Sequence, residues 1–269
     1  MKQAWLILAH NEFEVLQLLL RKMDSPDSDF YIHFDRKVKT LPAIEPLQYG
    51  RLFVLGERID GRWGDISLVR IELLLMETAL KNGPYTHYHI LSGVHLPLWP
   101  TDELIRFYDS LSDKTVLRFW ERVAVEVDFK MRRFHYPIRD FNSSNRLRRN
   151  VCRTLWRASL WLQKRLGIRH YRHLDFCKAD QWVSLSEQAC RFFVDTRKII
   201  LQKYRWSFCP DEFFVPTELT DHPEAGPYIH CSNLLYVEFG DDSPRTFPLA
   251  AYDELKQTGC MWARKFKAS

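Results

Sequence analysis

Continuous apolar runs alternate with segments of helical periodicity along the first third of the chain. Residues 4–9 (AWLILA) predict a buried strand, and residues 12–22 carry apolar side chains at helical spacing. The same order then recurs, with expected strands at 30–34, 52–55 and 86–92 and an expected helix at 66–81. This alternation predicts an α/β fold with a mostly parallel central sheet that is covered on both faces.

Polar residues follow several of these expected strands directly. His10 follows the first strand, Asp35 follows the second, and the segment 92–95 (SGVH) closes the fourth. In open parallel sheets, ligands bind outside the carboxyl ends of the strands. These strand-end residues are therefore candidates for a ligand site.

The remainder of the chain is also mixed α/β, apart from one basic segment. The expected elements are a helix at 102–111, strands at 115–120, 181–185 and 233–239, a helix at 186–204, a short helix from Asp211, and helical turns to the end. We therefore expect one domain over 1–269. Its parts would be a first α/β half (1–125), a basic helical insertion (130–173) and a second mixed α/β half (174–269).

Nearly all of the excess positive charge lies in residues 130–173. This segment has thirteen Lys and Arg and one acidic residue, Asp140, which leaves 26 basic and 33 acidic residues elsewhere. Apolar residues recur at helical spacing within it: Leu147, Val151, Leu155, Ala158, Leu162 and Leu166. Three interpretations stay open here: a solvated helical face, a membrane-surface helix on anionic lipid with Trp156 and Trp161 at the interface, and nucleic-acid binding without a recognition motif.

Composition narrows the class of protein further. The chain has 269 residues, of which 46% are apolar, enough for a substantial core. Its apolar runs are far shorter than the roughly 20 residues of a membrane-spanning helix. The N-terminal run ends at His10-Asn11 without a small-residue cleavage site, which favours a strand over a signal peptide. The six cysteines are at least 13 residues apart, so we expect free thiols in a reducing cytoplasm.

Several common catalytic motifs are absent from the sequence. No Gly-rich dinucleotide motif, P-loop, H-E-x-x-H or G-x-S-x-G sequence is present. The one D-x-D sequence, Asp27-Ser28-Asp29, falls in an expected helix-to-strand loop, where turn chemistry explains it. We therefore expect no metal and no cofactor.

Two local clusters carry chemistry that a transfer reaction could use. Glu212, in Cys209-Pro210-Asp211-Glu212-Phe213-Phe214, is either part of an ordinary helix start or a rigidly held general base. Lys265, within Trp262-Ala263-Arg264-Lys265-Phe266, and Arg245 are either surface cations or groups that neutralise a diphosphate leaving group.

Seven blocks of sequence, taken together, resemble the core-2/I-branching glycosyltransferases. In chain order they are AHNE (9–12), FYIHFD (30–35), RWGDISLV (62–69), YHILSG (88–93) with PL (97–98), QWVSLS (181–186), PDEFF (210–214) and ARKF (263–266). The resemblance runs from about residue 4 to about residue 267 and omits only the basic segment.

The resemblance implies a glycosyltransferase A (Rossmann-like) fold and an inverting transfer from a UDP-sugar without the usual metal. Carried over by position, Glu212 is the expected base, and Arg245 and Lys265 are the expected pair that neutralises the UDP diphosphate. His10 and Asp35 would hold uridine, with Trp63 stacking on or covering the base. Residues 1–125 would then be the nucleotide-binding half, and residues 174–269 the acceptor and catalytic half. GlcNAc is the expected sugar, from the commonest activity of the family.

On the acceptor side, the resemblance points to His95, Trp99 and Trp182. The family commonly has an acidic residue where this chain has His95, and a basic or polar one at Trp99. The identity of the acceptor therefore does not carry over, and His95 is alternatively a buried strand-end histidine.

We expect a glycan or lipid-linked glycan acceptor and a cytoplasmic enzyme at the inner face of the membrane. The basic segment would contact anionic lipid, and we expect no nucleic acid. A different class also stays open: a non-catalytic module that uses residues 130–173 to bind membranes or RNA.

Overall fold

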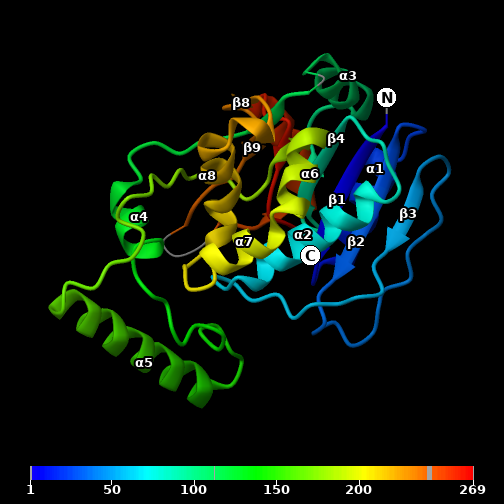
Figure 1. The fold of residues 1–269 in the computed structure, drawn as a ribbon. Helices are drawn as coiled ribbons and strands as arrows, with labels where there is room; N and C mark the ends of the chain where they lie inside the picture. The colour runs from blue at the N-terminus through cyan, green and yellow to red at the C-terminus, as the bar shows by residue number, and fades with distance from the viewer. Residues whose placement is uncertain (1, 112, 241–243, 269) are drawn as a thin grey trace.

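A seven-stranded sheet forms the centre of the molecule in a computed structural model, which describes residues 2–111, 113–240 and 244–268 (Figure 1). Its strand order is β3-β2-β1-β4-β7-β6-β8. These strands are β1 (Gln3–Ala9), β2 (Ser28–Phe34), β3 (Arg51–Val54), β4 (His87–Ser92), β6 (Thr115–Leu117), β7 (Ser184–Ser186) and β8 (Tyr228–His230). The first four are parallel, and β7 is antiparallel to both of its neighbours. The predicted α/β class with a mostly parallel sheet is confirmed.

Helices cover the sheet, and two small sheets extend it. The helices are α1 (Phe13–Met23), α2 (Ser67–Leu80), α3 (Thr101–Leu111), α4 (Ala124–Lys130), α5 (Arg146–Arg165), α6 (Glu187–Asp195), α7 (Arg197–Lys203), α8 (Phe214–Asp221) and α9 (Tyr252–Leu255). Short 3-10 turns are η1 (Pro210–Glu212), η2 (Pro223–Ala225), η3 (Leu249–Ala251) and η4 (Lys256–Thr258). The small sheets are β5 (Leu96–Pro97) with β11 (Trp262–Ala263) and β9 (Leu235–Tyr236), and β10 (Phe247–Pro248) with β12 (Phe266–Lys267).

The connections reverse direction in the middle of the sheet. From β1 the chain moves to β2 and β3 on one side, and from β3 it returns across them to β4 on the other. Because such crossovers are right-handed, the helices of the two connections cover opposite faces. Figure 1 shows α2, α6 and α7 on one side of the sheet, where they pack against one another. Every residue of β1, β2 and β4 is buried. The carboxyl ends of β1 and β4 therefore lie where the connections reverse, which is where open α/β sheets bind their ligands.

The later part of the chain departs from several sequence-based boundaries. The expected helix at 186–204 is two helices separated at Thr196. The strand expected at 181–185 is Ser184–Ser186, and the one expected at 233–239 is reduced to Leu235–Tyr236. Helical turns do occupy 249–258, but the chain then forms β11 and β12 instead of ending in helix. These strands are two residues long, and pairing with distant strands, which no local pattern records, fixes them.

The basic segment lies outside the sheet, and its helix α5 stands apart from the body of the molecule in Figure 1. The Asn145 side chain caps this helix by accepting a hydrogen bond from the Arg148 N–H, at 3.1 Å. The buried face of α5 is formed by Cys152, Trp156 and Gln163, whereas its leucines are exposed. The basic segment therefore contains the helix that its apolar spacing predicts. The membrane-surface interpretation placed Trp156 at the interface, but its ring is buried and packs against Phe141 at 5.0 Å.

Asp29 is a buried structural ion-pair residue at the amino end of β2. Its carboxylate accepts hydrogen bonds from the Arg51 guanidinium at 2.5 Å, the Tyr85 hydroxyl at 2.7 Å and Lys2 Nζ at 3.1 Å. Burial would raise the pKa of Asp29, but these hydrogen bonds outweigh it and lower the pKa to about 2. Asp29 therefore fixes the edge strand β3 at the amino ends of the strands, on the edge of the sheet opposite to His10 and Asp35.

None of the helices in the described part of the chain is long and apolar enough to cross a membrane. All six cysteines are free, as their spacing predicts.

Replacing Asp29 with Asn is expected to destabilise the fold by about 2 kcal/mol at neutral pH. Because the folded pKa lies below that of the unfolded chain, the contribution of Asp29 is complete above about pH 4 and disappears as the pH falls towards about 2. Urea denaturation of both proteins across this range measures the effect. A constant difference between wild type and Asp29→Asn at all pH values would contradict this account.

Candidate active site

The loops that follow β1 and β2 are joined at the edge of the sheet by Asp35. Its backbone N–H donates to the Ala9 carbonyl at 2.9 Å, directly before His10. Its carboxylate accepts from Lys37 Nζ at 2.9 Å and from the Gly61 N–H at 3.0 Å. Asp35 therefore holds the loop that precedes Trp63, and the sequence-based pairing of His10 with Asp35 at one edge agrees with this geometry.

A positive cluster faces His10. Desolvation lowers the pKa of the His10 imidazole, and the charges of Lys265, Lys37 and Arg264 lower it further, whereas Asp35 acts in the opposite direction. Residues from the two ends of the chain thus share one electrostatic environment. An anion bound here would lie among several cations beside a largely neutral imidazole.

Trp63 presents an exposed ring next to this cluster. Just over half of the residue is exposed, at 52%, and its ring packs edge-on against Phe208 at 5.1 Å. Gly64 follows with a positive φ of 79°, and the Phe208 ring is so close that a Cβ would lie 2.6 Å from it. Glycine is required at this position, and the exposed Trp63 ring is free to cover a planar group.

Glu212 lies at the end of the 3-10 turn η1. Pro210 starts the turn, and Cys209 precedes it in the left-handed region with φ 50°. The Glu212 carboxylate is 30% exposed and pairs with Lys130 Nζ at 2.8 Å and Lys178 Nζ at 3.5 Å. Both lysines also contact Glu126, at 2.7 and 2.8 Å. Glu212 is thus a half-buried carboxylate in a fixed orientation, as a general base requires.

Two buried carboxyl groups lie behind Glu212. Burial and the charge of Glu212 raise the pKa of Asp211 to about 7. Burial also raises the pKa of Glu72, and the charge of Asp211 adds to this shift. Glu72 accepts a hydrogen bond from the Gln181 amide at 2.6 Å, and its other oxygen has no partner. This pair favours its protonated forms next to the ionisable Glu212.

Arg264 connects the cationic cluster to the carboxylates. Its guanidinium lies 4.5 Å from the centre of the Trp182 ring. Desolvation lowers its pKa to about 10, and the charges of Asp180 and Asp211 counteract that shift. Arg264 therefore lies within the electrostatic range of Asp211, the residue before Glu212, and Lys265 is the next residue in the chain.

The backbone of Arg245 lies next to the backbone of Lys265. The Lys265 N–H approaches the Arg245 carbonyl at 3.5 Å, and the Phe247 N–H donates to the Lys265 carbonyl at 2.7 Å. The Arg245 side chain is 68% exposed and pairs with Glu238 at 2.8 Å. Its backbone is therefore at the site, and its guanidinium would have to leave Glu238 to reach a ligand.

The three predicted acceptor residues are not gathered around Glu212. His95 is fully buried, and its Nδ1 lies 2.8 Å from the Ser92 hydroxyl. Trp182 is buried against His95 and Arg264. Trp99 lies at the other end of β5, where its Nε1–H donates to the Gly259 carbonyl at 3.2 Å. The position of His95 supports the alternative of a buried strand-end histidine, so we do not carry it forward as an acceptor ligand.

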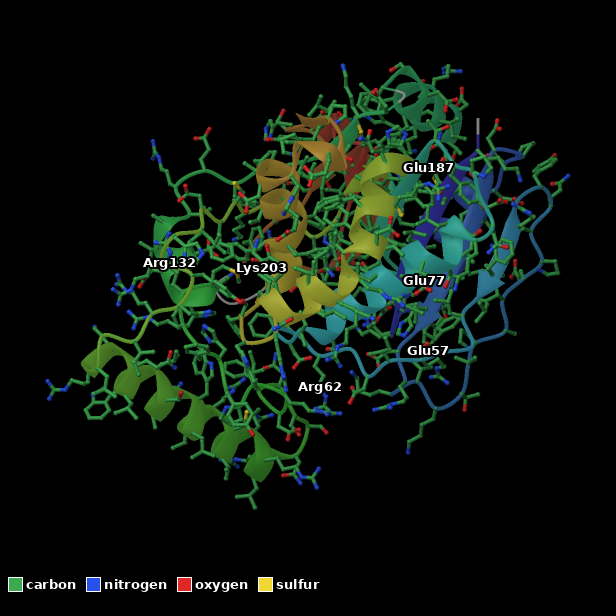
Figure 2. All side chains as sticks on the ribbon, in the orientation of Figure 1. Glu57, Arg62, Glu77, Arg132, Glu187 and Lys203 are labelled. Carbon is green, nitrogen blue, oxygen red and sulfur yellow. The ribbon has the colours of Figure 1, made fainter. Side chains whose placement is uncertain are left out.

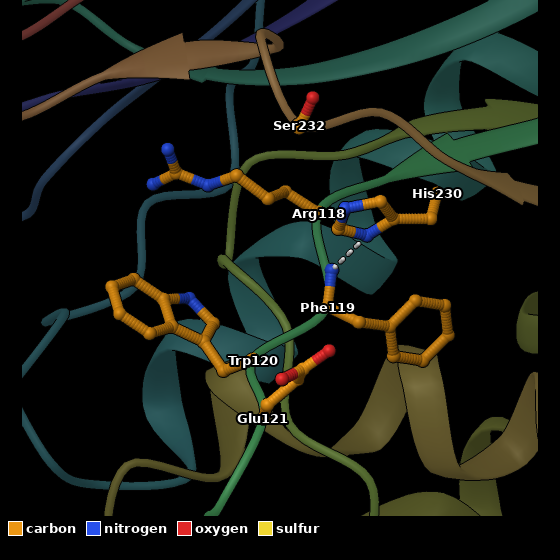
Figure 3. A pocket seen from close by; sticks show the side chains of 6 residues that line it. All are labelled: Arg118, Phe119, Trp120, Glu121, His230 and Ser232. Carbon is orange, nitrogen blue, oxygen red and sulfur yellow. Dashed lines mark hydrogen bonds between the residues drawn. The ribbon is translucent and has the colours of Figure 1, made fainter.

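A surface cavity of about 490 Å³ opens on the β6 side of the sheet (Figure 3). It is lined by Arg118, Phe119, Trp120, Glu121, His230 and Ser232. The Trp120 Nε1–H donates to Asp180 at 2.8 Å, and Arg118 pairs with Asp180 at 2.7 Å. Asp180 follows Ala179, whose N–H donates to the Glu212 carbonyl at 3.0 Å. Residues 179–180 therefore contact the Glu212 backbone on one side and the Trp120 and Arg118 side chains of the cavity on the other.

Sequence reasoning missed this cavity and the lysine pair. Lys130 is the last residue of α4, and Lys178 lies in the loop before β7, next to Ala179, whose N–H donates to the Glu212 carbonyl. Only the tertiary structure brings both lysines to the Glu212 carboxylate. Trp120 and Arg118 carry no motif, although an aromatic residue next to a charged one at a strand end was a usable signal. In the described residues, no three His, Cys, Asp or Glu side chains gather as a metal site.

The chain belongs to the Core-2/I-Branching enzyme family, whose model matches residues 3–254. It is therefore a glycosyltransferase by family. Glu212 and Arg245 lie within the matched region, whereas Lys265 lies beyond it.

Solved structures resemble the chain only distantly. Mouse xyloside xylosyltransferase 1, in its apo form, has 9% sequence identity and a TM-score of 0.40, with 97% of each chain covered. HddC from Yersinia pseudotuberculosis has 9% identity and a TM-score of 0.27, with 44% of this chain and 58% of that chain covered. No curated protein matches the sequence.

Asp211→Asn is expected to change the pH dependence of stability. Because the folded pKa of Asp211 is raised to about 7, the wild-type protein loses stability as the pH rises from about 4 to about 7. The variant has no such proton to lose. Its free energy of unfolding should therefore rise relative to that of the wild type as the pH increases from about 4 to about 7. Urea denaturation at several pH values measures this difference. The exposed Asp102→Asn is the control, and parallel curves for Asp211→Asn and wild type would contradict the raised pKa.

Proposed function

We propose that this protein is an inverting glycosyltransferase that moves a sugar from a UDP-sugar to a hydroxyl group of a glycan or lipid-linked glycan, without a metal. The observation that carries the proposal is the fixed Glu212 carboxylate, which pairs with Lys130 at 2.8 Å and Lys178 at 3.5 Å. In this proposal, the cations that act on His10 form the subsite for the diphosphate, and Glu212 accepts the proton.

In the proposed reaction, Glu212 is the general base. The acceptor hydroxyl forms a bond to the anomeric carbon while its proton passes to the Glu212 carboxylate. The bond from the anomeric carbon to the UDP oxygen breaks at the same time, and the negative charge that develops on UDP is stabilised by Lys265 and Arg245. Attack opposite to UDP converts an α-linkage into a β-linkage. Lys130 and Lys178 orient the Glu212 carboxylate for this step.

The two substrates would occupy the two sides of this site. Uridine would bind at His10 and Asp35 under the exposed Trp63 ring, within the nucleotide-binding half. The acceptor would approach from the cavity at Trp120, whose ring can stack on a sugar. We retain GlcNAc as the proposed sugar, and we propose that the enzyme works in the cytoplasm at the inner face of the membrane.

Glu212→Gln is expected to lower the transfer rate by about 10²- to 10⁴-fold, because the amide cannot accept the proton. The affinity for UDP should be unchanged. Glu187→Gln is a matched control, since Glu187 is also a half-exposed glutamate (32%) paired with a basic side chain, on α6. A transfer assay with calorimetric UDP binding separates the two effects. Equal rates for Glu212→Gln and Glu187→Gln would refute the role of Glu212.

Lys265→Ala is expected to weaken UDP binding in EDTA by about 10- to 100-fold, because a charge-assisted hydrogen bond to the diphosphate is lost. Arg245→Ala should weaken it less, since Glu238 already holds that guanidinium. Lys256→Ala, which removes a surface lysine paired with Asp253, is the control. Isothermal titration with UDP in EDTA and then with Mn²⁺ measures these affinities. Absence of UDP binding in both conditions would favour the non-catalytic module.

A further inference from the structure

The most unusual surface of the molecule is the outer face of α5. Its apolar side chains are at least half exposed: Leu147 73%, Val151 50%, Leu155 53%, Trp161 62% and Leu162 50%, followed by Leu166 64% directly after the helix. Apolar residues are ordinary on surfaces when they are scattered, whereas a contiguous group marks an interaction site. We call these six residues the apolar face of α5.

The apolar face cannot turn inward, because the opposite face of α5 is anchored. The Trp156 Nε1–H donates to His135 at 3.0 Å, and the Trp156 ring packs against Phe141. Two helical turns after Trp156, the Gln163 side chain accepts a hydrogen bond from the Phe134 N–H and donates one to the Phe134 carbonyl, each at 2.8 Å. These contacts fix the rotation of α5 about its axis, so the exposure of its leucines is built into the fold.

Positive charge flanks the apolar face. Helix α5 contains seven Lys and Arg and no acidic residue. By helical periodicity, Arg146, Arg157 and Lys164 border one side of the face and Arg148 borders the other. All four are exposed, and within the described residues none of them has an acidic partner. An apolar stripe with cationic borders is typical of helices that lie in a membrane interface.

Charge complementarity decides among the occupants of this face. A second copy of the chain would place two helices of like charge against each other, which costs free energy. A nucleic acid would pair with the arginines but would leave the leucines in water. An anionic bilayer satisfies both parts, since its headgroups pair with the cations while its acyl boundary receives the leucines.

We propose that α5 docks the protein on an anionic lipid bilayer, lying in the membrane plane with its apolar face at the acyl boundary. Trp161 is placed at the level of the headgroups, where indole rings accumulate. The Arg and Lys borders contact the anionic lipids.

The basic segment that carries α5 also contacts residues of the candidate active site. Arg62, which is labelled in Figure 2 and directly precedes Trp63, donates to the Arg139 carbonyl at 2.9 Å and to the Asp140 carboxylate at 3.1 Å, both in the basic segment. Lys130, where that segment begins, pairs with Glu212. Docking through α5 would therefore hold Glu212 near the surface of the membrane. If the proposed function is correct, this position favours an acceptor whose glycan is attached to a lipid.

Flotation of the full-length protein with vesicles tests the docking. We expect binding to phosphatidylcholine vesicles that contain phosphatidylglycerol, and much weaker binding to phosphatidylcholine alone. The double substitution Leu155→Glu and Leu162→Glu should weaken binding at least about tenfold, because it places charge at the acyl boundary. Replacing Arg146, Arg157 and Lys164 with Gln should weaken vesicle binding about a hundredfold. Each cation near an anionic surface raises the affinity roughly fivefold, and three such factors multiply to about a hundred.

The matched control is Ile199→Glu on α7, which also adds a carboxylate at a highly exposed apolar residue (65%). It should bind vesicles as the wild type does. Absence of vesicle binding by the wild type, or equal binding by the Leu155/Leu162 variant, overturns the proposal. A wild-type dimer in sedimentation analysis that the same variant abolishes would assign the face to self-association instead, and RNA binding without vesicle binding would assign it to nucleic acid.

Calorimetric UDP binding by the same variants separates this proposal from the proposed function. The variants should bind UDP normally, since none of the substituted residues belongs to the donor site. Vesicle binding without UDP binding by the wild type would refute the proposed function and leave the docking intact. UDP binding without vesicle binding would refute the docking and leave the proposed function intact.

Discussion

Complete burial of β1 between β2 and β4 is the constraint on which the rest of the structure depends. A parallel strand that is buried on both faces needs helices on both sides. The two connections that supply them run in opposite directions along the sheet, from β1 to β2 and from β3 back to β4. The carboxyl ends of β1, β2 and β4 therefore meet at one edge, where two connections diverge. His10 and Asp35 reach that edge because they follow these strands directly, and the Ala9 carbonyl binds the Asp35 backbone there.

Alternation of opposite charges organises the site on this frame. Lys130 and Lys178 bind Glu212 and Glu126 together, while Arg264 lies in the field of Asp180 and Asp211. Each cation thus offsets the desolvation of a neighbouring carboxylate, which allows several charged groups to be partly buried within a small volume. The exception is the pair Glu72 and Asp211, where burial and neighbouring carboxylates outweigh the effect of the cations and favour the protonated forms. Strongly shifted pKa values of buried carboxyl groups are typical of functional sites.

The basic segment follows a different rule from the rest of the molecule. Elsewhere the periodic apolar residues of helices point to the core, as Val15, Leu16 and Leu19 of α1 do. In α5 the inner face is formed instead by Trp156, Cys152 and the amide of Gln163, and the leucines point outward. Helix α5 leaves Leu147, Leu155 and Leu162 exposed, and among the residues that the structure describes none of its arginines has an acidic partner. Such a helix gains its stability from few tertiary contacts, which is consistent with an additional surface that covers it.

The sequence by itself determined the parallel half of the sheet, the helices around it and the family. Continuous apolar runs and helical periodicity are local properties, so they define β1, α1, β2, α2 and β4 to within a few residues. Tertiary structure decided what depends on distant contacts. It broke the helix at Thr196, added β11 and β12 at the C-terminus, buried His95 and brought Lys130 and Lys178 to Glu212. It also decided which face of α5 is buried, because periodicity shows that a helix has an apolar face but not which surface covers it.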